Sequence, residues 1–131
     1  HAANVAAHPR AKLVSVYDTH RPFAEDVAAR NGITAADSAD AIFASGDIDA
    51  VLVATVTDTH ADYIERAVAA GKPVLCEKPI DLSLARVNAC AEKIKDASVV
   101  VQLGFNRRFD PGHRAAHDAV LAGEIGDLHQ V

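Results

Sequence analysis

Glu77 and Lys78 follow directly after a short apolar run, residues 74–76, that is predicted to form a buried strand. Pro73 and Pro79 mark the two ends of this run. Because ligands bind at the carboxyl ends of the strands in an open α/β sheet, the two charged residues are predicted to lie at a ligand-binding edge. A Lys at such an edge could bind a substrate hydroxyl or move a proton, whereas the alternative is a solvated Glu–Lys pair in a loop.

Asp18 stands at the end of another predicted strand, residues 13–17. A carboxylate in that position can accept hydrogen bonds from the two hydroxyls of an adenosine ribose, and it repels a 2′-phosphate. Asp18 therefore predicts a preference for NAD over NADP, although the nearby Arg21 leaves use of NADP open. The alternative is that Asp18 caps the helix that starts near Arg21.

Two more predicted strands end in polar residues. After residues 50–54, Thr55 is predicted to meet a cofactor, and His60 lies either beside that cofactor or on the surface in the first turn of a helix. After residues 99–103, Asn106 and Arg107 offer directional donors for the hydroxyls of a polyol. The alternative for this last segment is a helix cap with solvated arginines.

His113 and His117 are four residues apart on a predicted helix, a spacing that can hold a metal ion. The sequence places no Glu or Cys near them, so we predict no metal site. No motif supports a Ser-His-Asp nucleophile either.

Helices and strands are predicted to alternate along the whole chain, which is typical of an α/β fold with a doubly wound parallel sheet. The predicted helices are residues 1–8, 21–30, 38–43, 60–70, 83–95 and 110–121, with residues 57–59 capping the fourth. The predicted strands are residues 13–17, 33–34, 50–54, 74–76, 99–103 and the beginning of one at 128–131.

The glycine-rich turn of a dinucleotide-binding unit does not occur in this sequence. Counting back from Asp18, its glycines would fall just before His1, so we expect the first strand and its turn to lie outside these residues. In the doubly wound order that strand is the central one. The prediction is therefore an incomplete Rossmann-type sheet, in which two half-sheets lack their shared neighbour.

Composition excludes several partner classes. The 131 residues carry a net charge of −5, which gives no basic surface for nucleic acid or an anionic membrane. No apolar run approaches the roughly 20 residues of a membrane span. The two cysteines, Cys76 and Cys90, are predicted to be buried thiols, and the cytoplasm is the expected compartment.

Two segments carry a family resemblance: Cys-Glu-Lys-Pro at residues 76–79 and Gly-Phe-Asn-Arg-Arg-Phe-Asp-Pro at residues 104–111. Together they resemble the Gfo/Idh/MocA family of nicotinamide-dependent sugar and polyol oxidoreductases, and within it the inositol 2-dehydrogenases. The resemblance spans essentially the whole chain as an internal piece of a longer protein. One departure is Val56, where the family usually has Pro or Asn.

The resemblance implies NAD-dependent oxidation of a cyclitol hydroxyl, myo-inositol to 2-keto-myo-inositol, by the full-length protein. It implies that Lys78 is catalytic and that the base is a His of a second domain, so residues 1–131 alone are expected to be inactive. Residues 1–126 are assigned to the NAD-binding domain and 127–131 to the start of the second domain, through which the full-length protein is expected to form a homo-oligomer. The alternatives are a dehydrogenase of another sugar or polyol and a non-catalytic nucleotide-binding domain. The implied cofactor-side residues are Asp18, Thr55, His60, Glu77 and Lys78, and the implied substrate-side residues are Lys78, Asn106 and Arg107.

Overall fold

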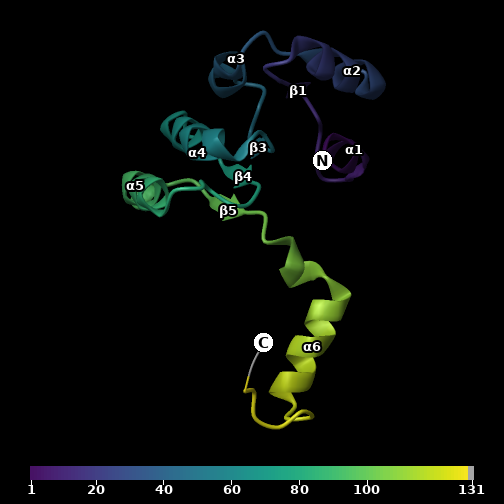
Figure 1. The fold of residues 1–131 in the computed structure, drawn as a ribbon. Helices are drawn as coiled ribbons and strands as arrows, with labels where there is room; N and C mark the ends of the chain where they lie inside the picture. Colours follow the sequence, from purple (N-terminus) through teal and green to yellow (C-terminus); the bar gives the residue numbers. More distant parts are fainter. Residues whose placement is uncertain (130–131) are drawn as a thin grey trace.

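Figure 1 shows the computed structural model, which describes residues 1–129. Helices and strands alternate as predicted. In chain order the elements are α1 Ala2–Ala7, β1 Ser15–Val16, α2 Arg21–Asn31, β2 Thr34–Ala35, α3 Ala39–Ala44, β3 Val51–Val53, the 3-10 turn η1 Thr57–Thr59, α4 His60–Ala69, β4 Val74–Cys76, α5 Leu84–Ile94, β5 Val101–Leu103, the 3-10 turn η2 Asn106–Phe109 and α6 Pro111–Leu121. The strand β4 has its predicted bounds, whereas β1, β3 and β5 are shorter than their apolar runs.

The strands form two separate parallel sheets. One contains β1 and β2, and the other has the order β3-β4-β5. In the larger sheet Val51 pairs with Val74 and Val74 with Val101, so the three strands run in register and end at the same edge. Parallel strands joined by helices define a Rossmann-type α/β fold, and its division into two sheets confirms the prediction of an incomplete one.

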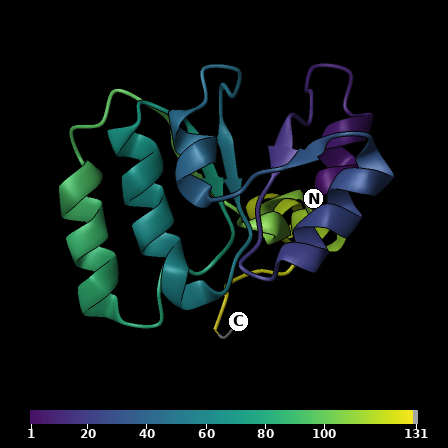
Figure 2. The ribbon, with the colours of Figure 1, turned by 90° about the horizontal axis from the view of Figure 1, so that it is seen from above.

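A cavity of about 1040 Å³ lies between the two sheets, lined by residues of β1 and β3. Figure 2 shows the two sheets standing apart from each other. Leu52 and Leu75 line this cavity, and 38% of Leu75 is exposed. The prediction that residues 74–76 form a buried strand therefore holds for one face only, because Val74 and Cys76 are buried while Leu75 faces the cavity.

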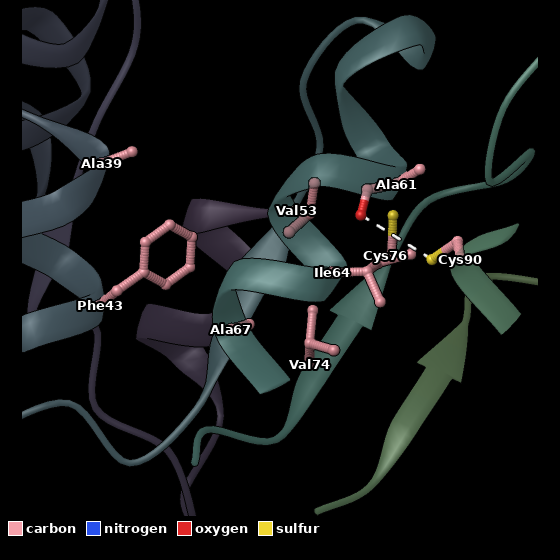
Figure 3. Packing of buried hydrophobic residues seen from close by; sticks show 9 residues of the cluster. All are labelled: Ala39, Phe43, Val53, Ala61, Ile64, Ala67, Val74, Cys76 and Cys90. Atoms are coloured by element: carbon pink, nitrogen blue, oxygen red, sulfur yellow. Dashed lines mark hydrogen bonds between the residues drawn. The ribbon is translucent and has the colours of Figure 1, made fainter. Parts of the chain in front are cut away.

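The core lies on the other face of the larger sheet, under α4 and α5 (Figure 3). There Ile64 and Ala67 of α4 pack with Val53 and Val74, and all four are buried. Full removal of such side chains from water contributes about 1.5–3 kcal/mol for each large apolar residue. This packing fixes where β3 and β4 end, and so positions the residues that follow them.

Cys76 and Cys90 also lie in this core, as free buried thiols. The Cys90 thiol faces the carbonyl oxygen of Ala61 at 3.8 Å. Burial raises the pKa of the Cys76 thiol to about 11, so at neutral pH it is an unreactive thiol. The prediction of buried thiols is confirmed.

Three helices begin with a side-chain cap. The side chains of Ser38, Ser83 and Asp110 each accept a hydrogen bond from a backbone N–H in the first turn of the helix that follows. The predicted cap at residues 57–59 is wrong, because these residues form a 3-10 turn and the Thr59 hydroxyl donates to the Val56 carbonyl at 2.7 Å.

The helix α6 extends away from both sheets (Figure 1) and packs on η2. The strand predicted to begin at residue 128 lies partly outside the described residues, and residues 128 and 129 have no regular structure. The predicted domain boundary, between residues 126 and 127, lies in the same end of the chain and stays a prediction. Among residues 1–129, no helix has the length and apolarity needed to cross a membrane.

Candidate active site at the strand ends

Lys78, Asn106 and Arg107 line one cavity of about 550 Å³, together with Phe105 and Arg108. Lys78 follows β4, and the other residues follow β5, so the shared sheet edge brings together positions almost thirty residues apart. All three are exposed. Within residues 1–129 the Lys78 ammonium makes no ion pair, which leaves its three donors available to a ligand in the cavity.

The carboxylate of Glu77 lies at the same edge and is held at both oxygens. His1 Nε2 lies 2.7 Å from Glu77 Oε1, and the backbone N–H of Lys78 donates to Oε2 at 3.3 Å. Gly104 lies against this carboxylate: a Cβ on Gly104 would stand 3.0 Å from Glu77 Oε2. Glu77 therefore links the start of α1 to the ends of β4 and β5, a set of contacts with no local sequence signal.

Asp18, predicted to bind the cofactor, is exposed and lines the large cavity. Its Oδ1 accepts a hydrogen bond from the backbone N–H of His20 at 2.7 Å. This contact belongs to the turn that leads into α2, whose N-cap is His20, so Asp18 supports the turn and keeps Oδ2 for a ligand. An exposed carboxylate with a free oxygen fits the hydroxyls of a ribose.

The nearby Arg21 is already paired. Its guanidinium bonds the side chains of Glu25 at 2.8 Å and Asp37 at 2.6 Å. These hydrogen bonds, that of Glu25 first, raise the pKa of Arg21 above its ordinary value. A guanidinium held by two carboxylates is poorly available to a 2′-phosphate.

Thr55 is exposed beyond β3 and lines the large cavity. Its hydroxyl lies 2.7 Å from the hydroxyl of Thr59. Because Thr59 donates its one hydrogen to Val56, Thr55 is the donor in this pair, and its own lone pairs remain for a ligand.

His60 lies in the interior, with an exposed fraction of 2%. Its Nδ1 is 2.7 Å from the Pro79 carbonyl oxygen, and its Nε2 is 3.0 Å from the Thr55 carbonyl oxygen. Of the two alternatives for His60, the surface position is wrong, because the ring is buried and both of its nitrogens face backbone carbonyl oxygens. The spacing of His60, Ala61, Ile64 and Ala67 could have revealed this, since it places His60 on the buried stripe of α4.

The histidines of α6 pair with carboxylates. His113 Nδ1 lies 3.0 Å from Asp110, and His117 Nδ1 lies 3.1 Å from Asp118. Hydrogen bonds from the His113 side chain and backbone N–H lower the pKa of Asp110. Over the described part of the chain, no three His, Cys, Asp or Glu side chains are grouped as a metal ion requires.

A parallel α/β sheet whose strand ends carry Asp18, Thr55 and Lys78 defines a dinucleotide-binding domain of the Rossmann class. The chain belongs to the Gfo/Idh/MocA family, whose model, described as an oxidoreductase family with an NAD-binding Rossmann fold, matches residues 1–105. The family expected from residues 76–79 and 104–111 is thereby confirmed.

Several inositol dehydrogenases are similar to this chain. Inositol 2-dehydrogenase of Rhizobium meliloti is 46% identical over 131 residues, which are all of this chain and 39% of that protein. Scyllo-inositol 2-dehydrogenase (NAD(+)) of Bacillus subtilis is 43% identical over 96% of this chain and 37% of that protein. The chain thus spans less than two fifths of the length of these relatives.

Solved structures of inositol dehydrogenases are also similar to this chain. The crystal structure of scyllo-inositol dehydrogenase from Lactobacillus casei with bound cofactor NAD(H) and scyllo-inositol has a TM-score of 0.88 and 33% identity, over 96% of this chain and 38% of that one. A myo-inositol dehydrogenase from Corynebacterium glutamicum has a TM-score of 0.86 and 49% identity, over 97% and 38% of the two chains.

Proposed function

We propose that the full-length protein carrying these residues oxidises a secondary hydroxyl of a cyclitol, myo-inositol to 2-keto-myo-inositol, with NAD as the hydride acceptor. The observation that carries this proposal is the cavity that Lys78 shares with Asn106 and Arg107 at the ends of β4 and β5. The similarity to inositol dehydrogenases from several bacteria supports the substrate class.

Each residue of the cavity has a distinct role in this proposal. The Lys78 ammonium donates a hydrogen bond to the oxygen that becomes the ketone, and it stabilises the negative charge that develops there as the proton leaves. Asn106 and Arg107 donate to neighbouring hydroxyls, which fixes the ring orientation. NAD, when bound, would supply the acceptor for the hydride. The hydroxyl proton would pass to the base, the His of the second domain that the family resemblance implies.

On the cofactor side, Asp18 lines the large cavity with a carboxylate, and Thr55 lines it with a hydroxyl. We assign Asp18 to the adenosine ribose and Thr55 to the cofactor near the strand end. Glu77 supports this side through its contact with His1. The exposed carboxylate of Asp18 and the paired guanidinium of Arg21 both favour NAD over NADP.

For the full-length protein we also propose a homo-oligomer in the cytoplasm. The family resemblance supports the assembly, and the two unpaired thiols Cys76 and Cys90 suit a reducing compartment. Light scattering of the purified protein measures the oligomeric state, and a monomer would contradict the proposal.

The function is tested by NADH formation from a panel of polyols with the full-length protein. We expect myo-inositol to be oxidised with a specificity constant at least about tenfold above that for glucose, which corresponds to a difference of about 1.4 kcal/mol in transition-state binding. Equal rates on inositol and glucose would favour a broader sugar dehydrogenase. NAD binding without turnover of any polyol would favour a non-catalytic domain.

A further inference from the structure

We propose that His60 is a positioning residue that holds Lys78 on the substrate side in a fixed relation to Thr55 on the cofactor side. This inference rests on the function proposed above. Its basis is the buried imidazole, which touches the carbonyl oxygens of Thr55 and Pro79 from its two ring nitrogens. These two residues follow neighbouring strands, so one side chain joins two ends of the sheet.

The contact occurs where the backbone ladder stops. The N–H of Glu77 donates to the Val53 carbonyl at 2.9 Å, and this is the last backbone hydrogen bond joining the β3 and β4 segments within residues 1–129. Beyond it the chain after β3 turns into η1 while the chain after β4 continues toward α5. The ring of His60 bridges the two segments past that point.

Lys78 is the residue that this arrangement fixes. The backbone N–H before it, that of Glu77, is held by β3, and the carbonyl after it, that of Pro79, is held by His60. The N–H of Lys78 itself donates to the Glu77 carboxylate at 3.3 Å. The backbone of Lys78 is thus constrained on both sides, while its side chain stays exposed toward the cavity.

A purely apolar side chain would fill the space under α4 but would not make this bridge. Carbonyl oxygens only accept hydrogen bonds, so His60 bonds both of them at once only when both ring nitrogens carry a hydrogen, and it bonds one of them when a single nitrogen does. Thr55 and Pro79 are exposed residues, so a carbonyl that loses its bond to His60 is free to turn toward water. Loss of either contact should therefore displace the segment on that side only.

Two amide substitutions separate the two contacts. The amide nitrogen of Asn occupies the place of Nδ1 and can still donate to Pro79, whereas that of Gln occupies the place of Nε2 and can still donate to Thr55. For His60→Gln we expect kcat to fall about tenfold or more with KM for NAD within about twofold of wild type, because Lys78 is released. For His60→Asn we expect the reverse, a KM for NAD raised about fivefold and kcat within about threefold.

Ile64→Val provides the matched control, because Ile64 lies one turn along the same helix, is fully buried in the core and, being apolar, donates no hydrogen bond to either carbonyl. All variants are compared in the full-length protein by thermal melting and steady-state kinetics. The control should lower the melting temperature without separating kcat from KM. If one amide variant unfolds, the other still tests the positioning role of His60, because each variant has its own predicted change in kcat and KM.

Identical kinetic changes in His60→Asn and His60→Gln, or changes that only follow the melting temperature as in Ile64→Val, would overturn the positioning role. The proposed function fails differently: the wild-type protein then oxidises no polyol. In that case NAD affinity measured by titration still tests His60, since His60→Asn should weaken it and His60→Gln should not. Equal affinities would contradict the inference.

Discussion

The carboxylate of Glu77 is held by His1 and by the backbone of Lys78, and it lies directly against Gly104. Gly104 is needed here for a close approach and not for its backbone angles, since its φ is not positive. A methyl group at this position would press on Glu77 Oε2, and the carboxylate would have to shift by a few tenths of an ångström. A substitution of Gly104 therefore tests whether the contacts of Glu77 support the site.

Gly104→Ala is expected to lower the free energy of unfolding by about 1 kcal/mol and to reduce turnover, because the shift of the carboxylate weakens the hydrogen bonds of Glu77. Urea unfolding and steady-state kinetics of the full-length protein measure the two effects. Gly46→Ala is the matched control, as a Cβ there meets nothing within 4 Å. If both substitutions behaved alike, the role given to Gly104 would be wrong.

At the scale of elements, an ion cluster joins α4 to α5. Glu65 of α4 is paired with Arg86 and Lys93 of α5, and its side chain is 11% exposed. Burial by itself raises the pKa of Glu65, but the hydrogen bonds from Arg86 and Lys93 outweigh it and lower the pKa below its ordinary value. The cluster fixes how the two helices cover the sheet that carries Lys78.

The sign of the pH dependence follows from this shift. Because the pKa of Glu65 is lower in the folded state, the ionised carboxylate stabilises the fold fully above the unfolded pKa of about 4.3, and this contribution is lost as the pH falls through the folded value. Glu65→Gln should therefore lower the free energy of unfolding by about 1–3 kcal/mol at pH 7. The variant should also lose less stability than wild type when the pH falls below about 4.3.

The control for this prediction is Glu92→Gln, an exposed partner of Lys95 on α5. Exposed pairs contribute at most about 1 kcal/mol, so this variant should unfold nearly like wild type at both pH values. Urea unfolding of the full-length proteins at pH 7 and at pH 4 gives the comparison. An unchanged pH dependence in Glu65→Gln would show that the cluster contributes little.

Local signals predicted the elements well, for physical reasons visible at particular residues. Ser38, Ser83 and Asp110 cap helices through their own side chains, and Gly32 ends α2 with a φ of 64°. Such signals act within a few residues of the chain. The hydroxyl of Thr59 could equally bond a neighbouring carbonyl, which is why the cap expected at residues 57–59 did not form.

Long-range contacts could not be predicted in the same way. His1 and Glu77 are 76 positions apart, and the approach of Gly104 to Glu77 depends on the sheet order. The strand ends themselves were predictable, so Lys78, Asn106 and Arg107 were selected from the sequence and lie around one cavity in the structure. The roles of Asp18, Thr55 and Glu77 toward NAD stay predictions.

For the whole molecule, the main feature is the cavity of about 1040 Å³ between the two sheets. The sequence contains no Gly-x-Gly-x-x-Gly turn, whose backbone N–H groups bind the pyrophosphate of a dinucleotide. Residues 1–131 as an isolated polypeptide should therefore bind NAD only weakly, with a dissociation constant above about 1 mM, or about 4 kcal/mol of binding free energy.

Calorimetric titration of NAD into this polypeptide, with circular dichroism of the same sample, measures that prediction. Micromolar binding would mean that other residues among the 131 form the phosphate site, and the account of the open sheet would need replacement. The full-length protein is the positive control.

The role of Lys78 in the chemistry is the central proposal, because its ammonium is the donor placed at the cavity that it shares with Asn106 and Arg107. The most direct measurement is turnover and NAD affinity of Lys78→Ala in the full-length protein, with Lys95→Ala as the exposed control. We predict that kcat falls at least about a hundredfold while the dissociation constant of NAD changes less than about threefold. Turnover that stays close to wild type would contradict the assignment of Lys78 to the chemistry.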